Sequence, residues 1–118
     1  MKMKELDCSH WYLDIEMDYG SDLDLLMAVD ILKFFMLSAV KTMFGEVAAS
    51  STLDILKFDE EERRAIVRVP SENYAKFRAA LTMCSAVRLD KDVFPFIFTI
   101  KQASSCLLSL TGPQRIIT

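Results

Sequence analysis

Apolar and polar residues alternate along two segments of the chain, residues 9–17 and 94–100. The apolar positions are Trp11, Leu13, Ile15 and Met17 in the first segment, and Phe94, Phe96, Phe98 and Ile100 in the second. A period of two residues is typical of a strand with one buried face, so both segments are predicted to be strands. Pro95 has no N–H to donate to a neighbouring strand, which favours an edge strand or the beginning of a strand.

Two shorter apolar runs, residues 53–58 and 64–69, flank the polar sequence Asp-Glu-Glu-Glu-Arg at 59–63. This connection has the length expected in a β-hairpin. The two runs are therefore predicted to form an antiparallel pair of strands.

Between the first strand and this hairpin, apolar residues recur at helical spacing. Asp22 or Asp24 is placed to cap the beginning of a long helix, because a carboxylate there accepts hydrogen bonds from free N–H groups and interacts favourably with the helix dipole. The helix is predicted to end near Phe44, where Gly45 suits the left-handed C′ position.

Residues 71–84 are predicted to form a second helix, with Ser71 as its N-cap. A last short helix is expected over residues 104–110. The predicted order, βαββαβ followed by a C-terminal helix, matches a ferredoxin-like α+β fold, which is a two-layer sandwich with both helices on one face of the sheet. One domain is expected to span residues 1–118, a size suited to a single core.

Hydrophobic residues make up 52% of the chain, so membrane insertion has to be considered. The richest apolar run, residues 23–40, is interrupted by charged residues and is predicted to pack against protein rather than to span a membrane. The N-terminus lacks the apolar stretch of a secretory signal, which favours an intracellular protein. The three cysteines are far apart and form no C-x-x-C pair, so neither a disulfide framework nor a zinc site is expected.

The formal net charge is −3, and no cluster of Lys and Arg marks a basic face. Proteins that bind nucleic acid on their own usually gather such residues, because the cations displace counterions from phosphate groups. RNA-recognition modules share the predicted topology, but the run 64–69 lacks their basic-glycine-aromatic pattern. Independent RNA binding is not expected, and which residues contact RNA, if any, stays open. The weak candidates are Arg63, Arg64, Lys76, Arg78 and Lys101.

Three sets of residues carry groups used in catalysis or metal binding, and each has a simpler explanation. Ser38 and Lys41 match the S-x-x-K spacing of serine acyl-enzymes, but the S-D-N and K-T-G partners of that motif are missing. The acidic run 59–62 fits no calcium-loop spacing and is explained by an exposed hairpin turn. His10 belongs to no recognisable triad or ligand set. No catalytic residue, metal site or cofactor is therefore expected.

The long helix is predicted to carry a second apolar strip besides its core face. Met27, Ile31 and Phe34 are spaced four and three residues apart and fall among polar residues on the opposite side of the helix. These three residues form a predicted partner-binding strip. In the alternative explanation the helix rolls or the C-terminal helix covers the strip, since single apolar residues are common on protein surfaces.

Four segments of the chain carry a family resemblance: Leu37-Ser38-Ala39-Val40-Lys41, Phe44-Gly45-Glu46-Val47, Leu53-Asp54-Ile55-Leu56 and, more loosely, Ala65-Ile66-Val67-Arg68-Val69. They resemble the ribonuclease P subunits that include the fourteen-kilodalton protein and its Pop-five paralogue, with the closer match to the fourteen-kilodalton branch. None of the segments is a catalytic signature.

The resemblance implies a non-catalytic structural subunit of the ribonuclease P ribonucleoprotein, whose RNA supplies the active site that removes the 5′ leader from precursor transfer RNA. It further implies a nuclear and nucleolar location. The implied partners are the Pop-five paralogue, the thirty- and forty-kilodalton subunits and, at least indirectly, the ribonuclease P RNA. Neither a membrane nor a small-molecule substrate is expected. A stand-alone protein-interaction adaptor with no RNA role is the alternative, and an enzyme on this common fold lacks a visible set of catalytic residues.

Overall fold

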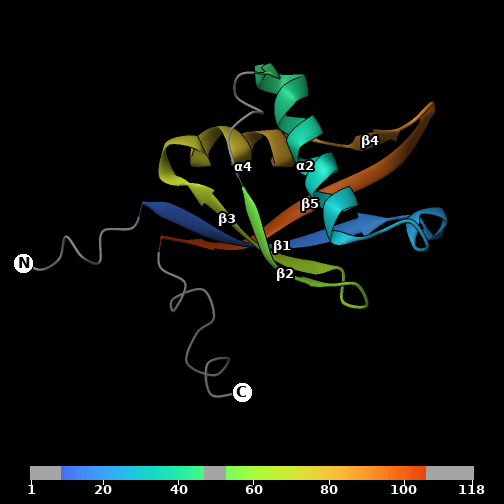
Figure 1. The fold of residues 1–118 in the computed structure, drawn as a ribbon, viewed down its shortest axis with the longest axis horizontal. Helices are drawn as coiled ribbons and strands as arrows, with labels where there is room; N and C mark the ends of the chain where they lie inside the picture. The colour runs from blue at the N-terminus through green and yellow to red at the C-terminus, as the bar shows by residue number, and fades with distance from the viewer. Residues whose placement is uncertain (1–8, 47–52, 106–118) are drawn as a thin grey trace, which may run out of the picture.

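The computed structural model describes residues 9–46 and 53–105. Within these ranges five strands form one sheet: β1 (His10–Tyr19), β2 (Asp54–Asp59), β3 (Arg64–Pro70), β4 (Ala86–Leu89) and β5 (Asp92–Ser104). The helices are α2 (Val29–Phe44) and α4 (Tyr74–Met83), and short 3-10 turns at Ser21–Leu23 and Ser71–Asn73 precede them. Both helices lie on the same face of the sheet (Figure 1).

The strand order is β2-β3-β1-β5-β4, and every neighbouring pair is antiparallel. β2, β3, β1 and β5 occupy the positions of the four strands of a ferredoxin-like sandwich, so the predicted fold class is confirmed. β1 lies in the middle of the sheet. Its register with β3 pairs Leu13 with Val67 and Ile15 with Ala65, so the buried residues of the two strands lie opposite each other.

The structure adds one strand to the predicted four. β4 pairs with the beginning of β5 across a tight turn at residues 90 and 91. Pro95 lies opposite Ala86 in this ladder, close after the beginning of β5 at Asp92. The sequence left two explanations for Pro95, an edge strand or the beginning of a strand. The edge strand is wrong, because β5 lies inside the sheet, between β1 and β4. The missing N–H is tolerated because the ladder is short and continues with the Phe96 N–H, which donates to a carbonyl before β4.

The long helix begins later than predicted. Its N-cap is Ala28, which makes no side-chain capping hydrogen bond, so the prediction of Asp22 or Asp24 as the cap is wrong. The reason is packing. The loop before the helix buries Leu23 and Met27 in the core, which a continuous helix from residue 22 would not do.

Two further boundaries differ from the sequence prediction. Ser71 is not the N-cap of α4, because it lies in the preceding 3-10 turn and its N–H donates to the Ser9 carbonyl at 2.8 Å. Asn73 holds the cap position without a side-chain hydrogen bond. Ser104, where the sequence predicts a C-terminal helix to begin, is the last residue of β5. The rest of that predicted helix, from 106 to 110, lies outside the described residues.

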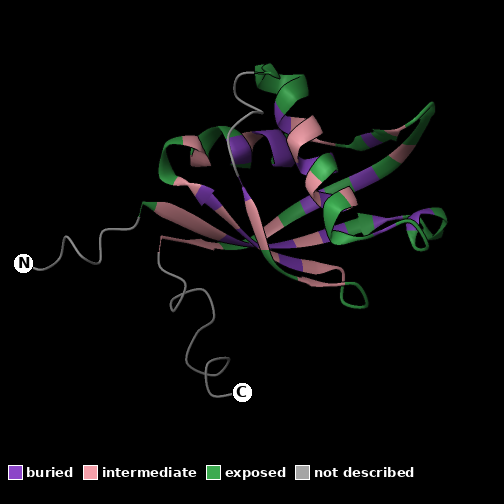
Figure 2. Ribbon diagram, viewed as in Figure 1, coloured by how far each residue is buried: buried purple, intermediate pink, exposed green. Residues whose placement is uncertain are grey.

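The core lies between the sheet and the two helices (Figure 2). β1 contributes alternate residues from Leu13 to Tyr19, as the period-two pattern predicts. The Phe96 ring of β5 packs against Tyr19, Phe35 and Phe98, with centroid distances of 5.1, 5.5 and 4.7 Å. This aromatic cluster of four residues joins α2 to the sheet, because Phe35 comes from the helix.

Gly45 ends α2 in a backbone conformation that is populated almost only by glycine, with φ 94° and ψ 174°. The positive φ is therefore confirmed, whereas the left-handed C′ position is wrong, because Gly45 is the C-cap and its ψ is extended. A Cβ atom added at this position would meet no atom within 4 Å, so a substitution is unfavourable through the backbone and not through a clash.

We expect Gly45→Val to lower the free energy of unfolding by about 1–3 kcal/mol, because a β-branched residue is strained at this φ. Urea denaturation followed by circular dichroism measures the change. Gly20→Ala is the control, since Gly20 has φ −75° and an added Cβ would approach only the movable carboxylate of Asp22. Equal losses in the two variants would contradict the backbone explanation.

Candidate functional site

The structure separates the three residues of the predicted partner-binding strip. Met27 lies in the loop before α2 and is only 5% exposed. Ile31 is half-buried against the core, and Phe34 projects from the helix with half of its surface exposed. The three residues therefore do not form one continuous exposed strip, and that prediction is wrong. It required Met27 to lie on the helix, but α2 begins only at Val29. Partner binding by Phe34 itself stays a prediction.

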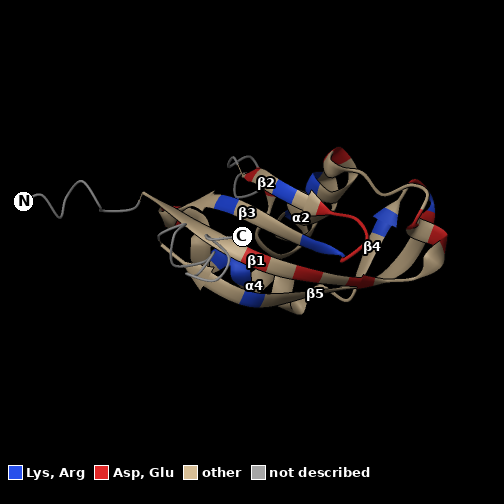
Figure 3. Cartoon of the chain, turned by 90° about the horizontal axis from the view of Figure 1, so that it is seen from below, with Lys and Arg blue, Asp and Glu red and all other residues tan. Residues whose placement is uncertain are grey.

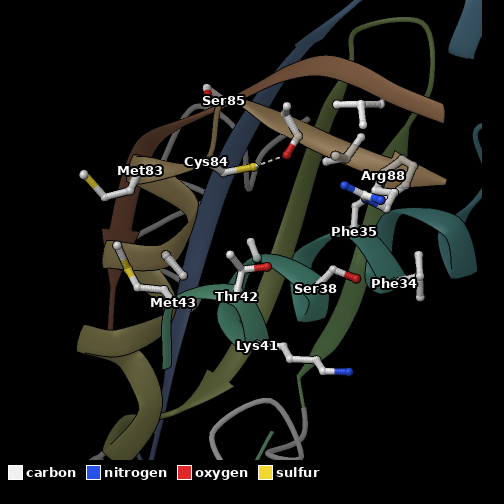
Figure 4. Close-up of a pocket in the computed structure, with 15 residues that line it drawn as sticks. Phe34, Phe35, Ser38, Lys41, Thr42, Met43, Met83, Cys84, Ser85 and Arg88 are labelled. Carbon is white, nitrogen blue, oxygen red and sulfur yellow. Dashed lines mark hydrogen bonds between the residues drawn. The ribbon is translucent and has the colours of Figure 1, made fainter. Parts of the chain in front are cut away.

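Phe34 lines a groove between α2, the end of α4 and the β4–β5 hairpin (Figure 4). The groove has a volume of about 700 Å³. Side chains of α2 form one wall, and residues 83–88 form the other together with Val93 of β5. β4 is also the outermost strand of the described sheet, so this second wall is a strand edge.

The groove concentrates exposed apolar side chains. Phe34, Met43, Met83 and Val93 are between 41% and 68% exposed, and all four line it. In Figure 4 the two methionines lie toward one end of the groove, and Phe34 and Arg88 lie toward the other. Large apolar side chains on one concave surface are typical of a protein-binding site. The sequence prediction missed Met83 and Val93, because it contained no β4 to bring Val93 next to α2.

Among the residues that the structure describes, both charged side chains that line the groove are cations, Lys41 from α2 and Arg88 from β4. Lys41 Nζ lies 3.2 Å from a Glu46 carboxylate oxygen, but both side chains are largely exposed, so this ion pair is weak and can exchange for another carboxylate. Arg88 makes no ion pair with any residue in the ranges 9–46 and 53–105. The described lining of the groove therefore carries two cations and no carboxylate, although the net charge of the chain is −3.

Lys and Arg positions lie beside Asp and Glu positions on the strands of the sheet (Figure 3), and the face away from the helices carries ion pairs. Asp14 of β1 is 3% exposed and accepts two hydrogen bonds from Arg64 of β3. Arg64 Nε donates to Oδ1 at 3.1 Å, and Nη2 donates to Oδ2 at 2.6 Å. The hydrogen bond to Asp14 raises the pKa of the Arg64 guanidinium. This pair crosses the two central strands and fixes both side chains against the sheet.

Two more ion pairs lie on this outer face. Arg68 Nη2 donates to Asp54 Oδ2 at 2.7 Å, and this hydrogen bond lowers the pKa of the Asp54 carboxyl. Lys101 Nζ lies 3.5 Å from a Glu16 carboxylate oxygen. Each of these three cations lies next to a carboxylate, whereas the exposed Lys57 of β2, which lies opposite Ile66 on the same face, makes no ion pair with the described residues.

The basic residues considered for RNA contact all have contacts within the chain. Arg63 lies over the Tyr19 ring, 3.9 Å from its centroid, and donates a hydrogen bond to Asp24 at 2.6 Å. Arg78 and Lys76 lie 5.8 and 5.9 Å from the centroid of a neighbouring aromatic ring. Arg64 and Lys101 belong to the ion pairs of the outer sheet face. The structure therefore adds no support for any one of them as an RNA-binding residue.

Two of the residues considered for catalysis, Lys41 and His10, are engaged in other contacts. Ser38 and Lys41 both line the groove, but the Lys41 ammonium lies against Glu46. Cys84 lies in the same groove and donates to a backbone carbonyl at 3.3 Å. Burial raises the pKa of the Cys84 thiol, which lowers the fraction present as reactive thiolate. His10 Nδ1 lies 2.9 Å from the hydroxyl of its neighbour Ser9.

Asp59 begins the turn of the β2–β3 hairpin, as the sequence predicts. Its Oδ1 accepts hydrogen bonds from the backbone N–H groups of Glu61 and Glu62, both at 3.1 Å, which explains the acidic run as turn chemistry. Among the residues that the structure describes, no three His, Cys, Asp or Glu side chains are grouped so that they could hold a metal ion. In the same ranges no helix is long and apolar enough to cross a membrane.

Known sequences match this chain over most of its length. The model of the Rpp14/Pop5 family matches residues 12–111. Ribonuclease P protein subunit p14 from Homo sapiens is 39% identical over 83 residues, which cover 70% of this chain and 64% of the human protein. The Mus musculus protein of the same name is 36% identical over 83 residues and is covered to 65%. The matched region thus spans slightly less than two thirds of these relatives.

A chain in the cryo-EM structure of yeast ribonuclease MRP has a similar fold, with a TM-score of 0.62 and 22% sequence identity. The superposition covers 92% of this chain and 85% of the yeast chain. At this level of identity the likeness supports the fold alone. The family match, in contrast, rests on sequence and includes the segments of α2, β2 and β3 that carry the resemblance. The chain therefore belongs to the Rpp14/Pop5 family.

Proposed function

We propose that this protein is a non-catalytic structural subunit of the ribonuclease P ribonucleoprotein, which removes the 5′ leader from precursor transfer RNA. The observation that carries the proposal is the 39% identity to human ribonuclease P protein subunit p14 over 83 residues. The origin of the yeast structural neighbour, a ribonuclease MRP particle, is consistent with a place in a ribonucleoprotein.

The surfaces of the domain favour action through protein contacts. Three cations on the outer sheet face, Arg64, Arg68 and Lys101, are paired with carboxylates, whereas the groove beside α2 exposes apolar side chains. Apolar concave surfaces bind protein, and strong RNA binding needs several cations that are free to neutralise phosphate. The proposed contact with the ribonuclease P RNA is therefore largely indirect.

The proposed protein partners are the Pop-five paralogue and the thirty- and forty-kilodalton subunits, as the family resemblance implies. The same resemblance supports a nuclear and nucleolar location. A fluorescently tagged full-length chain should accumulate in the nucleolus, and an exclusively cytoplasmic signal would argue against the proposed location.

Affinity purification tests the proposed function. The tagged full-length chain is purified from cells under native conditions, the copurifying RNA is sequenced, and the eluate is assayed for cleavage of precursor transfer RNA. We expect enrichment of the ribonuclease P RNA and removal of the 5′ leader. The ribonuclease MRP RNA is quantified in the same sample, since the structural neighbour comes from that particle.

Val67→Asp is the control for nonspecific RNA recovery. Val67 is fully buried, so the variant places an unpaired carboxylate in the core and strongly destabilises the fold. Equal RNA recovery with both chains, or with neither, would contradict the proposed function. Absence of the RNA from the wild-type eluate, with proteins still recovered, would favour the adaptor without an RNA role.

A further inference from the structure

We infer that the groove between α2 and the β4–β5 hairpin binds a short apolar segment of a partner protein that carries Asp or Glu residues. The inference deepens the proposed function and rests on it, because the partner is taken to be another protein of the same ribonucleoprotein.

The lining of the groove determines the apolar character of the segment. Four of the large apolar side chains that the structure leaves exposed converge here: Phe34, Met43, Met83 and Val93. They come from α2, α4 and β5, so the fold brings them together although they are distant in sequence. Methionine side chains are flexible and adapt to differently shaped apolar groups. A groove of about 700 Å³ has room for a few side chains of a bound segment.

Lys41 and Arg88 determine the acidic character of the segment. They come from opposite walls of the groove, and no Asp or Glu among the described residues lines it with them. A carboxylate on the bound segment would form charge-assisted hydrogen bonds with the Arg88 guanidinium, which has no described ion pair. The same two cations would repel a basic segment, so they provide specificity as well as affinity.

β4 offers backbone contacts in addition to side chains. It is the outermost strand of the described sheet, and residues 86–88 line the groove. The outward N–H and C=O groups of such a strand can pair with an added extended segment. The edge strand, the apolar side chains and the cations together form a surface suited to an extended acidic peptide.

The remaining segments of the chain itself fit this groove less well. Residues 47–52 and 106–118 contain no Asp or Glu. Residues 1–8 contain both Asp and Glu, but they precede β1 at the end of the sheet where Tyr12 pairs with Ser104. Val93 of the groove lies at the opposite end of β5. The β5 backbone between these ends spans about 35 Å, so a segment that reaches about 27 Å when fully extended does not reach Arg88 and Val93 at the far end of the groove.

RNA is a less suitable occupant than an acidic protein segment. Affinity for a phosphate backbone comes from several cations that displace counterions, and the groove supplies Lys41 and Arg88 alone among its described lining residues. Its remaining lining is mostly apolar, which favours a protein side chain over a phosphate group.

Peptide selection on the purified full-length chain tests the inference. The probe is a phage library of random peptides of about twelve residues, a length suited to an extended segment. It is selected in parallel on wild type, on the groove variant Lys41→Glu/Arg88→Glu and on the control variant Lys57→Glu/Lys76→Glu. The control carries the same charge change at exposed residues outside the groove.

We expect wild type and the control variant to enrich apolar peptides that contain Asp or Glu, and the groove variant to enrich apolar peptides that contain Lys or Arg. A synthetic copy of the enriched acidic peptide should bind the groove variant at least about ten-fold more weakly than wild type. Met83→Ser/Val93→Ser should weaken binding to a similar extent, and because both side chains are exposed, this variant keeps the core intact.

Several outcomes would overturn the inference. No enrichment, or acidic peptides that bind the groove and control variants equally, would remove the groove as their site. Displacement of the peptide by oligouridine RNA would assign the groove to RNA. Wild-type dimers that the groove variant abolishes, detected by analytical ultracentrifugation, would assign it to a second copy of the chain.

The two proposals fail separately. The selection uses the purified chain without RNA, so its failure leaves the proposed subunit role in place. Failure to copurify the ribonuclease P RNA would remove that role and leave the peptide-binding result unchanged.

Discussion

Phe96→Ala is expected to lower the free energy of unfolding by about 3–5 kcal/mol. The Phe96 side chain is fully buried, and its ring contacts those of Tyr19, Phe35 and Phe98. Truncation removes buried apolar surface and the edge-to-face contact with Phe35, and it leaves a cavity between α2 and the sheet that neighbours only partly fill. A typical small domain is stable by about 5–15 kcal/mol, so the expected loss is a large part of the total.

Urea denaturation followed by far-ultraviolet circular dichroism measures this loss. Ile97→Ala is the matched control, because Ile97 is the next residue of β5 and its side chain is 44% exposed on the opposite face of the sheet. We expect the control to lose less than ~1 kcal/mol. Equal losses in the two variants would contradict the central place of Phe96 in the aromatic cluster.

The position of Phe96 also shows which parts of the fold the sequence predicts well. Strict alternation in residues 94–100 determines which side chains share a face, because successive strand residues point to opposite faces of the sheet. The same pattern identifies β1, and the apolar runs on either side of the acidic turn at 59–63 identify β2 and β3. These elements are encoded by local pattern, and their order is sufficient to predict the ferredoxin-like topology.

β4 could not be recognised in the same way. It has only four residues, and Val87 is its one buried side chain. Its strand conformation depends on pairing with β5 across the turn at Asp90, where φ is 59°, so it is set by tertiary contact more than by its own sequence. One signal in the sequence could have identified β4. The polar residues 90–92 have apolar residues on both sides, which is typical of a β-hairpin turn.

The candidate site was harder to predict than the fold, because the groove depends on the relative positions of α2, α4, β4 and β5. The predicted strip required helical geometry at Met27, but packing of Leu23 and Met27 into the core delays the helix until Val29. Phe34 is the one residue of the strip that lines the groove. Spacing along a sequence identifies a shared face only inside a single regular element.

Asp14→Ala is expected to lower the free energy of unfolding by about 1–3 kcal/mol, because the variant leaves the Arg64 guanidinium without the carboxylate that accepts two of its hydrogen bonds. Asp14 is almost fully buried, whereas the Arg64 side chain is 33% exposed. Water can therefore replace part of the lost contact, which keeps the loss below the ~3–5 kcal/mol observed when a fully buried ion pair is broken.

Urea denaturation of Asp14→Ala, Arg64→Ala and the double variant completes a double-mutant cycle, in which we expect the double variant to lose less than the sum of the single losses. Glu16→Ala is the matched control, since Glu16 lies on the same strand and face but its ion pair with Lys101 is half-exposed, and its loss should stay below ~0.5 kcal/mol. Additive losses in the cycle would show that the ion pair is not the source of the effect. A measured coupling would instead establish the Asp14–Arg64 ion pair as a stabilising contact between β1 and β3.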